Sequence, residues 1–152
     1  MPSEPAQDLV HILSHAERRL VQRLATLLAE EDCSVERWRV LSAIADGQGH
    51  PMTEVAEYAL MLPPTLTKLV DRMADDNLVY RRPDPDDRRR VFLYLSARGR
   101  VLHQRVARRV EEDQAHVLAA LSDSGELART LGQLADVLDT RTGVAAAHRA
   151  GH

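Results

Sequence analysis

The sequence contains no hydrophobic run near the roughly 20 residues that a membrane-spanning helix needs. Its first residues, MPSEPAQD, lack the basic and apolar segments of a secretory signal peptide. It has one cysteine, Cys33, which excludes an intramolecular disulfide and a zinc site built from cysteines of this chain. We therefore expect a protein that makes no membrane contact and works in the reducing cytoplasm.

The motifs of common catalytic sites are also missing. The chain has no glycine-rich phosphate loop, no G-x-S-x-G sequence and no H-E-x-x-H sequence. His11 and His15 are one helical turn apart, as in a metal-binding pair, but the sequence fixes no third ligand. We expect neither an enzyme, nor a metal site, nor a cofactor.

What is present fits one folded domain with an uneven charge distribution. The chain has 152 residues, of which 44% are hydrophobic, and this is enough to bury a core. Residues 63–100 carry nine basic and six acidic side chains, whereas residues 1–62 carry five and ten. Nineteen of the twenty basic residues are arginine, whose planar guanidinium suits phosphate and guanine. The clustering favours a nucleic acid as partner for the middle segment.

Apolar residues recur at spacings of three and four over most of the chain, which predicts helices. Ser34, Thr53 and Ser96 precede three of these segments as expected N-caps. The helices are expected at 8–30, 35–45, 54–60, 64–76, 97–121 and 126–138. Two β-rich runs, 78–82 and 91–95, predict a hairpin. The small, polar residues 141–152 predict a disordered tail.

The helix at 64–76 is best defined by its ends. Pro63 and Pro64 are tolerated only in a first turn, and Asn77 can adopt the left-handed conformation that ends a helix. One face is apolar and must meet a core; it comprises Leu66, Leu69, Val70 and Met73. The opposite face comprises Pro64, Thr65, Thr67, Lys68, Asp71, Arg72 and Asp75.

The hairpin loop is unusually rich in arginine. The segment "RRPDPDDRRRVFLYLS", residues 81–96, holds five arginines, three aspartates and two prolines before its alternating strand. Prolines reduce the entropy lost when a loop is fixed, and arginines can enter the narrow, negative minor groove of DNA. The order of helices and hairpin predicts a mainly α fold: a winged helix-turn-helix (α-α-α-α-β-β wing) embedded in a helical dimerisation scaffold.

The segment "TEVAEYALMLPPTLTKLVDRMADDNLVYRRPDPDDRRRVFLYLSARG" resembles the DNA-binding core of the MarR family of transcriptional regulators. The diagnostic parts are "TKLVDRM" in the recognition helix and "DPDDRRR…LYLSARG" from the wing into the next helix. Asn77 stands where the family commonly has glycine, and Ser96 where it has threonine; both keep the local role.

The resemblance implies which residues contact double-stranded DNA. Pro64, Thr65, Thr67, Lys68 and Arg72 would face the major groove, and Asp71 would pair with an arginine instead of repelling phosphate. In the wing, Asp87 and Arg89 match the family's aspartate-x-arginine signature, in which the acid steadies the loop and the arginine enters the minor groove. Arg88 and Arg90 are the alternatives to Arg89.

Size and resemblance together predict a homodimer on a pseudo-palindromic operator. One winged helix reads too few base pairs to find a single site in a genome. Two recognition helices must lie ~34 to 36 Å apart, and a helix of about 25 residues is close to that length. We expect dimerisation segments at 1–33 and 96–140, a DNA-binding lobe at 34–95 and the tail at 141–152.

The family also implies regulation by a small phenolic or anionic ligand, in a crevice between the dimerisation helices and the DNA-binding lobe. The residues expected to line it are His15, Arg18, Trp38 and Arg39, and repression of a neighbouring gene is the expected outcome. Two alternatives stay open. One is a helical interaction module that does not bind DNA. The other is a redox-responsive regulator that uses Cys33, although Glu30, Glu31 and Asp32 would raise the pKa of its thiol.

Overall fold

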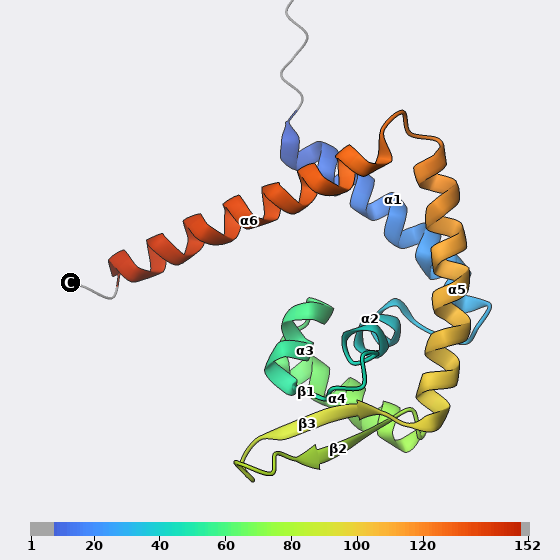
Figure 1. Cartoon of the computed structure of the whole chain (residues 1–152), viewed down its shortest axis with the longest axis vertical. Coiled ribbons are helices and arrows are strands. Elements are labelled where there is room, and N and C mark those ends of the chain that lie inside the picture. Colours follow the sequence, from blue (N-terminus) through green and yellow to red (C-terminus); the bar gives the residue numbers. More distant parts are fainter. Residues whose placement is uncertain (1–7, 150–152) are drawn as a thin grey trace, which may run out of the picture. The chain divides into compact units, whose positions relative to one another are not determined.

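The computed structural model describes residues 8–149, and side chains to residue 140. Within this range the chain forms two compact units, residues 8–110 and 111–149. The elements in chain order are α1 (Leu9–Ala29), α2 (Val35–Ala43), β1 (His50–Pro51), α3 (Met52–Ala59), α4 (Pro63–Asp75), β2 (Val79–Pro83), β3 (Val91–Leu95), α5 (Ala97–Ala119) and α6 (Ser124–Arg149) (Figure 1). The boundary between the units falls within α5.

The six expected helices are all present, and five of them end within two residues of their predicted bounds. Ser34 caps α2 by accepting a hydrogen bond from the Arg37 amide at 3.1 Å, and Ser96 caps α5 by accepting one from the Gly99 amide at 2.9 Å. The expected cap at Thr53 is wrong. The N-cap of α3 is Pro51, because β1 leads directly into that helix.

The last helix differs most from expectation. α6 continues to Arg149, well past the predicted end at residue 138. Of the tail expected at 141–152, residues 150–152 lie outside the described residues. Within α6 no described side chain is buried, and Leu127, Leu131, Val137 and Leu138 are all exposed. No helix within residues 8–149 combines the length and apolar character needed to cross a membrane.

The wing is part of a three-stranded antiparallel sheet rather than a hairpin alone. Its order is β1-β3-β2, so β3 is the central strand: Leu93 pairs with His50 on one side and with Arg81 on the other. The sequence analysis missed β1. A strand of two residues beside Gly47 and Gly49 is too short to show an alternating pattern.

The core of the first unit lies between α2, α3, α4 and the sheet. Leu66, Leu69, Val70 and Met73 of α4 are all buried, as the periodicity predicted. α1 contributes only Leu28 to the buried set, whereas other members of its apolar stripe, including Leu9, Ile12 and Leu20, remain exposed. The first two-thirds of α1 therefore presents apolar surface that the rest of the first unit does not cover.

A compact junction fixes α4 relative to β2 and α5. Asn77 takes the predicted left-handed conformation (φ 57°), and the Leu78 amide donates back to the Met73 carbonyl at 2.9 Å. The Ser96 hydroxyl donates to the Asn77 carbonyl at 2.6 Å while it caps α5. A Cβ at Gly99 would lie 2.0 Å from the Leu78 carbonyl oxygen, so only glycine permits this close approach.

Candidate nucleic-acid interface

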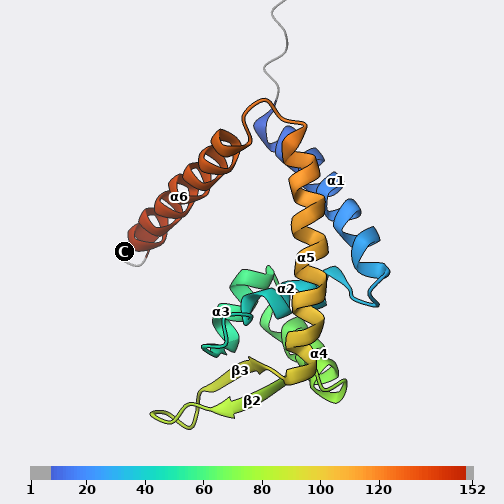
Figure 2. The ribbon, with the colours of Figure 1, turned by 45° about the vertical axis from the view of Figure 1, so that its right-hand side comes forward.

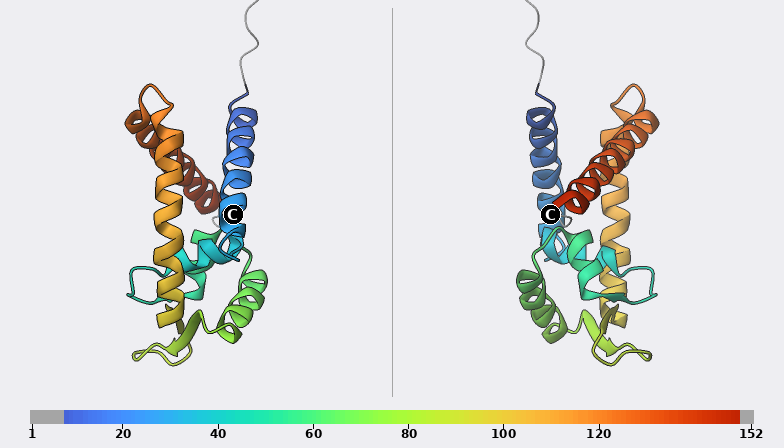
Figure 3. Two further views of the ribbon diagram at one scale, coloured as in Figure 1. Left: turned by 90° about the vertical axis from the view of Figure 1, so that its right-hand side faces the viewer. Right: turned by 90° about the vertical axis from the view of Figure 1, so that its left-hand side faces the viewer.

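The polar face of α4 is open to solvent. Pro64, Thr65, Thr67, Lys68 and Arg72 are all exposed, while the opposite face is buried in the core. Figures 2 and 3 show that α4 and the hairpin of β2 and β3 lie at the same end of the first unit, away from the start of α1. The five residues expected to face DNA thus share a surface with the wing close by.

Two residues of that face are turned partly toward α2. Thr65 and Arg72 line a cavity of about 280 Å³, together with Ser34, Glu36, Arg37, Met61 and Leu69. Thr67 donates its hydroxyl hydrogen to the Pro63 carbonyl at 3.0 Å. Because that hydrogen is engaged within the helix, Thr67 offers outward its methyl group and the acceptor lone pairs of Oγ1, but no donor.

Asp71 is paired with an arginine, as the sequence analysis expected. The partner is Arg81 of β2, whose Nη2 donates to Asp71 Oδ1 at 2.6 Å. The pair neutralises an acid on the DNA-facing side of α4 and connects that helix to the wing. Asp75 also lies exposed on α4, and the adjacent Asp76 pairs with Arg37 of α2 at 2.5 Å.

The loop between β2 and β3 is held by a buried carboxylate. Asp84 is only 8% exposed; its Oδ1 accepts from the Asp86 amide at 2.9 Å, and its own amide donates to the Arg90 carbonyl at 2.8 Å. Asp87 is exposed, and its carboxylate accepts from the Arg89 amide at 3.0 Å. Both acids order the loop backbone, and Asp84 does so from the interior.

The three consecutive arginines of the loop have different surroundings. Arg90 Nη1 lies 3.8 Å from Asp84 Oδ2, and its guanidinium carbon lies 5.5 Å from the centre of the Phe92 ring. Arg88 and Arg89 are exposed and form no ion pair with any residue that the structure describes. The loop therefore presents two unpaired guanidinium groups, while that of Arg90 is held beside Asp84 and Phe92 where the loop meets the strands.

Comparison with known proteins agrees with this architecture. The model of the MarR family matches residues 32–90. The regulator FarR of Neisseria gonorrhoeae is 26% identical over 113 residues, which are 74% of this chain and 77% of FarR. The repressor IacR of Pseudomonas putida is 35% identical over 77 residues, which are 51% of this chain and 46% of IacR. The crystal structure of NadR in complex with 4-hydroxyphenylacetate, 26% identical, superposes with a TM-score of 0.73 over 92% of this chain and 96% of NadR.

The chain is similar to MarR-family regulators, whose family model matches its residues 32–90. It is a winged helix-turn-helix transcriptional regulator, and the MarR model spans α2 to the end of the wing loop, the same segment that carries the exposed face of α4 and the arginine loop.

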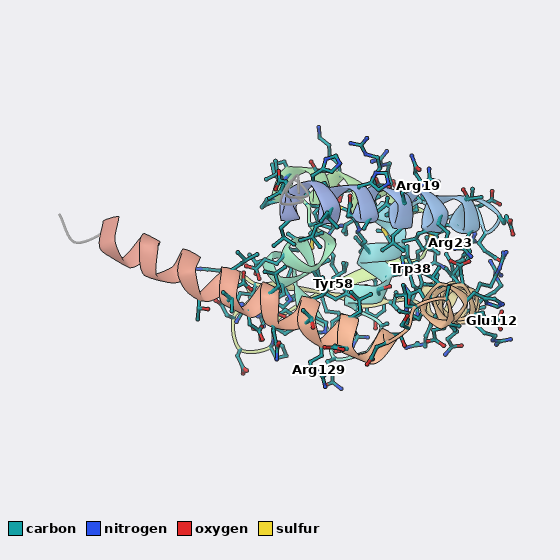
Figure 4. The ribbon with its side chains drawn as sticks, turned by 90° about the horizontal axis from the view of Figure 1, so that it is seen from above. Arg19, Arg23, Trp38, Tyr58, Glu112 and Arg129 are labelled. Atoms are coloured by element: carbon teal, nitrogen blue, oxygen red, sulfur yellow. The ribbon has the colours of Figure 1, made fainter. Side chains whose placement is uncertain are left out.

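The four expected ligand residues lie on two helices of the first unit. His15 and Arg18 are exposed on α1, whereas Trp38 and Arg39 are half-buried on α2. Trp38 stacks on His103 of α5, with ring centres 5.1 Å apart (Figure 4). None of the four lines the 280 Å³ cavity, nor a second one of about 670 Å³ beside the start of α5.

Cys33 has an unreactive environment. It is 5% exposed, and burial is the main cause that raises the pKa of its thiol from 9.0 to about 11. Glu31 raises the pKa further, and Arg37 partly offsets both effects. The direction agrees with the sequence analysis, but the main cause is desolvation and not the neighbouring carboxylates.

His11 and His15 stack with ring centres 6.5 Å apart. Among the described residues no group of three or more histidine, cysteine, aspartate or glutamate side chains is arranged to hold a metal ion.

Several residues at or near the interface were not singled out from the sequence. Arg81 and Asp84 were seen only as loop charges, since their partners are set by the pairing of β2 with β3. His50 lies between Asp46 and Glu54, at 2.9 and 3.1 Å, and these hydrogen bonds raise its pKa. The sequence did offer a signal for this cluster, because Asp46 and Glu54 each lie four residues from His50.

Proposed function

We propose that this protein is a cytoplasmic repressor of the MarR family, without enzymatic activity, that binds a pseudo-palindromic operator as a homodimer. In this proposal α4 enters the major groove through Pro64, Thr65, Thr67, Lys68 and Arg72. Arg88 and Arg89 enter the adjacent minor groove. Asp87 and Asp84 order the loop backbone, and Arg90 mainly stabilises the end of the loop next to β3.

One observation carries the proposal: an exposed polar helix face and two unpaired arginines lie at the same end of one unit. Exposed guanidinium groups with no internal partner are available to phosphates and to the negative minor groove. The separate ion pairs of Asp71 and Asp76 neutralise two nearby acids that would oppose a polyanion.

The dimer is supported by apolar surface that each unit, taken by itself, leaves exposed. Leu9, Val10, Ile12 and Leu20 of α1 are 41% to 71% exposed. On α6 the same is true of Leu127, Leu131, Val137 and Leu138. Such surface on helices outside the DNA-binding lobe favours a self-complementary contact with a second copy. The 23 residues of α5 extend about 34 Å, the separation of successive major grooves.

We further propose that a small phenolic or anionic ligand modulates DNA affinity. Support comes from the relative NadR, which binds 4-hydroxyphenylacetate, and from the half-buried aromatic and basic pair Trp38 and Arg39. His15 and Arg18, exposed on α1, would complete this ligand site. If the ligand bound the free protein ~2 to 3 kcal/mol more tightly than the DNA-bound protein, it would weaken DNA binding enough to regulate transcription.

The decisive experiment is a footprint on DNA upstream of the protein's own gene, followed by affinity measurements at several salt concentrations. The wild type should protect two half-sites about one helical turn apart and lose affinity steeply with salt. Arg89→Glu should weaken binding at least tenfold and lower the salt dependence. The matched control is Arg108→Glu, since Arg108 is exposed on α5, outside the proposed interface.

A helical interaction module predicts a different outcome. Arg89→Glu would then leave the main binding activity intact, and no duplex would be protected even in dilute buffer. A monomer at working concentrations, measured by sedimentation, would contradict the dimeric form of the proposal.

A further inference from the structure

Exposed apolar side chains gather immediately before the recognition helix. Between residues 34 and 95, only four large hydrophobic side chains are markedly exposed: Tyr58, Leu60, Leu62 and Tyr80. Three of these fall between the end of α3, where Figure 4 labels Tyr58, and the start of α4. Leu62 is the one at the head of α4, and 74% of its surface is exposed.

The local backbone directs Leu62 outward. Leu60 ends α3 in the left-handed conformation (φ 56°), and the Met61 amide donates back to the Ala56 carbonyl at 3.0 Å. Met61 then packs against the core, while Leu62 takes an extended conformation as the N-cap of α4. Neighbouring residues in an extended segment point to opposite sides, so the inward Met61 requires an outward Leu62.

The first turn of α4 offers almost no hydrogen-bond donors. Pro63 and Pro64 have no amide hydrogen, so Thr65 is the first residue of the helix with a backbone donor, and Leu62 at the N-cap adds an apolar side chain where a polar one is usual. The Thr67 hydroxyl hydrogen is already donated to the Pro63 carbonyl. The tip of the recognition helix therefore presents methyl and methylene groups where other helices present amides to phosphate.

One apolar group is available in the major groove of DNA: the 5-methyl group of thymine. The tip is continuous with the proposed interface, because Pro64 and Lys68 are four residues apart on α4 and Leu62 and Thr65 are three apart. A leucine at this position has no partner within the core, and the groove supplies one of matching chemistry.

We propose that Leu62, together with Pro63, Pro64 and the Thr67 methyl group, contacts a thymine methyl group in each half-site and is a specificity-determining residue. This inference rests on the proposed DNA-binding function. Removing one methyl contact lowers affinity roughly threefold, so a symmetric change in both half-sites should lower it about tenfold.

The test replaces each thymine of the footprinted half-sites by deoxyuridine, symmetrically in both half-sites and one position at a time. Deoxyuridine keeps every hydrogen-bonding group and lacks only the methyl group. The wild type should lose about tenfold in affinity at one position. Leu62→Ser should lose most of the preference for thymine over deoxyuridine at that position. Because serine is a favoured N-cap, this variant should also fold at least as stably as the wild type.

Leu60→Gly is the matched control. It removes an equally exposed leucine from the same turn, and its positive φ suits glycine. This variant should keep the full preference for thymine over deoxyuridine.

The outcomes separate this inference from the proposed function. Equal binding of the wild type to every deoxyuridine duplex, with the footprint intact, would overturn the inference and leave the DNA-binding function standing. A Leu62→Ser variant that keeps the tenfold preference would overturn it too, since the methyl contact would then lie elsewhere. Failure to bind any duplex would overturn both.

Discussion

Arg81 on β2 donates a hydrogen bond from Nη2 to Oδ1 of Asp71 on α4 at 2.6 Å, and so connects the wing to the recognition helix. Both side chains are partly exposed, and pairs of this kind contribute only about 0.2 to 1 kcal/mol to stability. Their effect on the angle between helix and wing, and on the charge of the groove-facing surface, is therefore more important than their effect on stability.

We predict that breaking this pair reduces specificity more than stability. Asp71→Asn removes a negative charge from the surface and should raise affinity for random DNA. Arg81→Gln removes a positive charge and should lower that affinity. Both changes should reduce the ratio of operator to random-DNA affinity, because both release the wing from α4. The measurement is fluorescence anisotropy with both duplexes at one salt concentration. An unchanged ratio in both variants would show that the pair has no positioning role.

The second prediction concerns the buried carboxylate of the wing. Asp84→Ala should destabilise the folded protein by about 1 to 2 kcal/mol, because the buried acceptor of the Asp86 amide is lost. It should also weaken operator binding several-fold, since Arg88 and Arg89 would no longer be held in place. Asp84→Asn keeps an acceptor and should show a smaller change in both measurements.

Asp87→Ala is the matched variant for that comparison. Asp87 also accepts a backbone hydrogen bond, from the Arg89 amide, but it lies in solvent. Water can replace an exposed acceptor, so its loss should cost less than the loss of Asp84. Thermal unfolding and operator affinity are measured for both variants. If Asp87→Ala has an effect equal to or larger than that of Asp84→Ala, the burial of Asp84 is unimportant to the loop.

Local chemistry explains why much of this fold was predictable. The buried positions of α4 follow from a period of 3.6 residues, and Ser34, Asn77 and Ser96 act within a few residues of their place in the chain. These features need no information about distant segments. The exposed face of α4 and the arginine loop were predictable for the same reason.

The features that were missed depend on which segments meet. Leu93 pairs with both His50 and Arg81, so β1 exists only when β3 lies beside it, and which arginine pairs with Asp71 depends on where β2 lies against α4. Asp84 and Asp87 look equivalent in the sequence, and only the closed loop buries one of them. The four expected ligand residues lie on two helices, and pattern alone does not fix the distance between them.

The third prediction is that Cys33 is chemically inert in the folded protein. Raising the pKa of its thiol from 9.0 to about 11 lowers the thiolate fraction at neutral pH about 100-fold. Alkylation by iodoacetamide at pH 8 should therefore be far slower in the native protein than in urea, and operator affinity should survive mild peroxide. Rapid native alkylation, or loss of binding that dithiothreitol restores, would support the redox-responsive alternative.

The last prediction is a pH-dependent stability contribution from His50. Hydrogen bonds to Glu54 and then to Asp46 raise its pKa above the usual 6.5, because the two carboxylates favour the charged ring. A group whose pKa is raised by folding stabilises the protein fully below its unfolded-state pKa. That stabilisation is lost as the pH rises through the folded-state pKa. His50→Gln should therefore cost more stability at pH 5.5 than at pH 8.5.

The pKa of Asp46 is lowered, first by the Gln48 amide and then by His50. Its own contribution is present above its usual value of 3.8, so it is constant across this range. The measurement is urea unfolding of wild type and His50→Gln at several pH values, with an expected difference below about 1 kcal/mol because the ring is partly exposed. His15→Gln is the control, since His15 stacks on His11 and has no carboxylate partner among the described residues. A difference between wild type and His50→Gln that stays constant from pH 5.5 to 8.5 would contradict a charged His50 between the two acids.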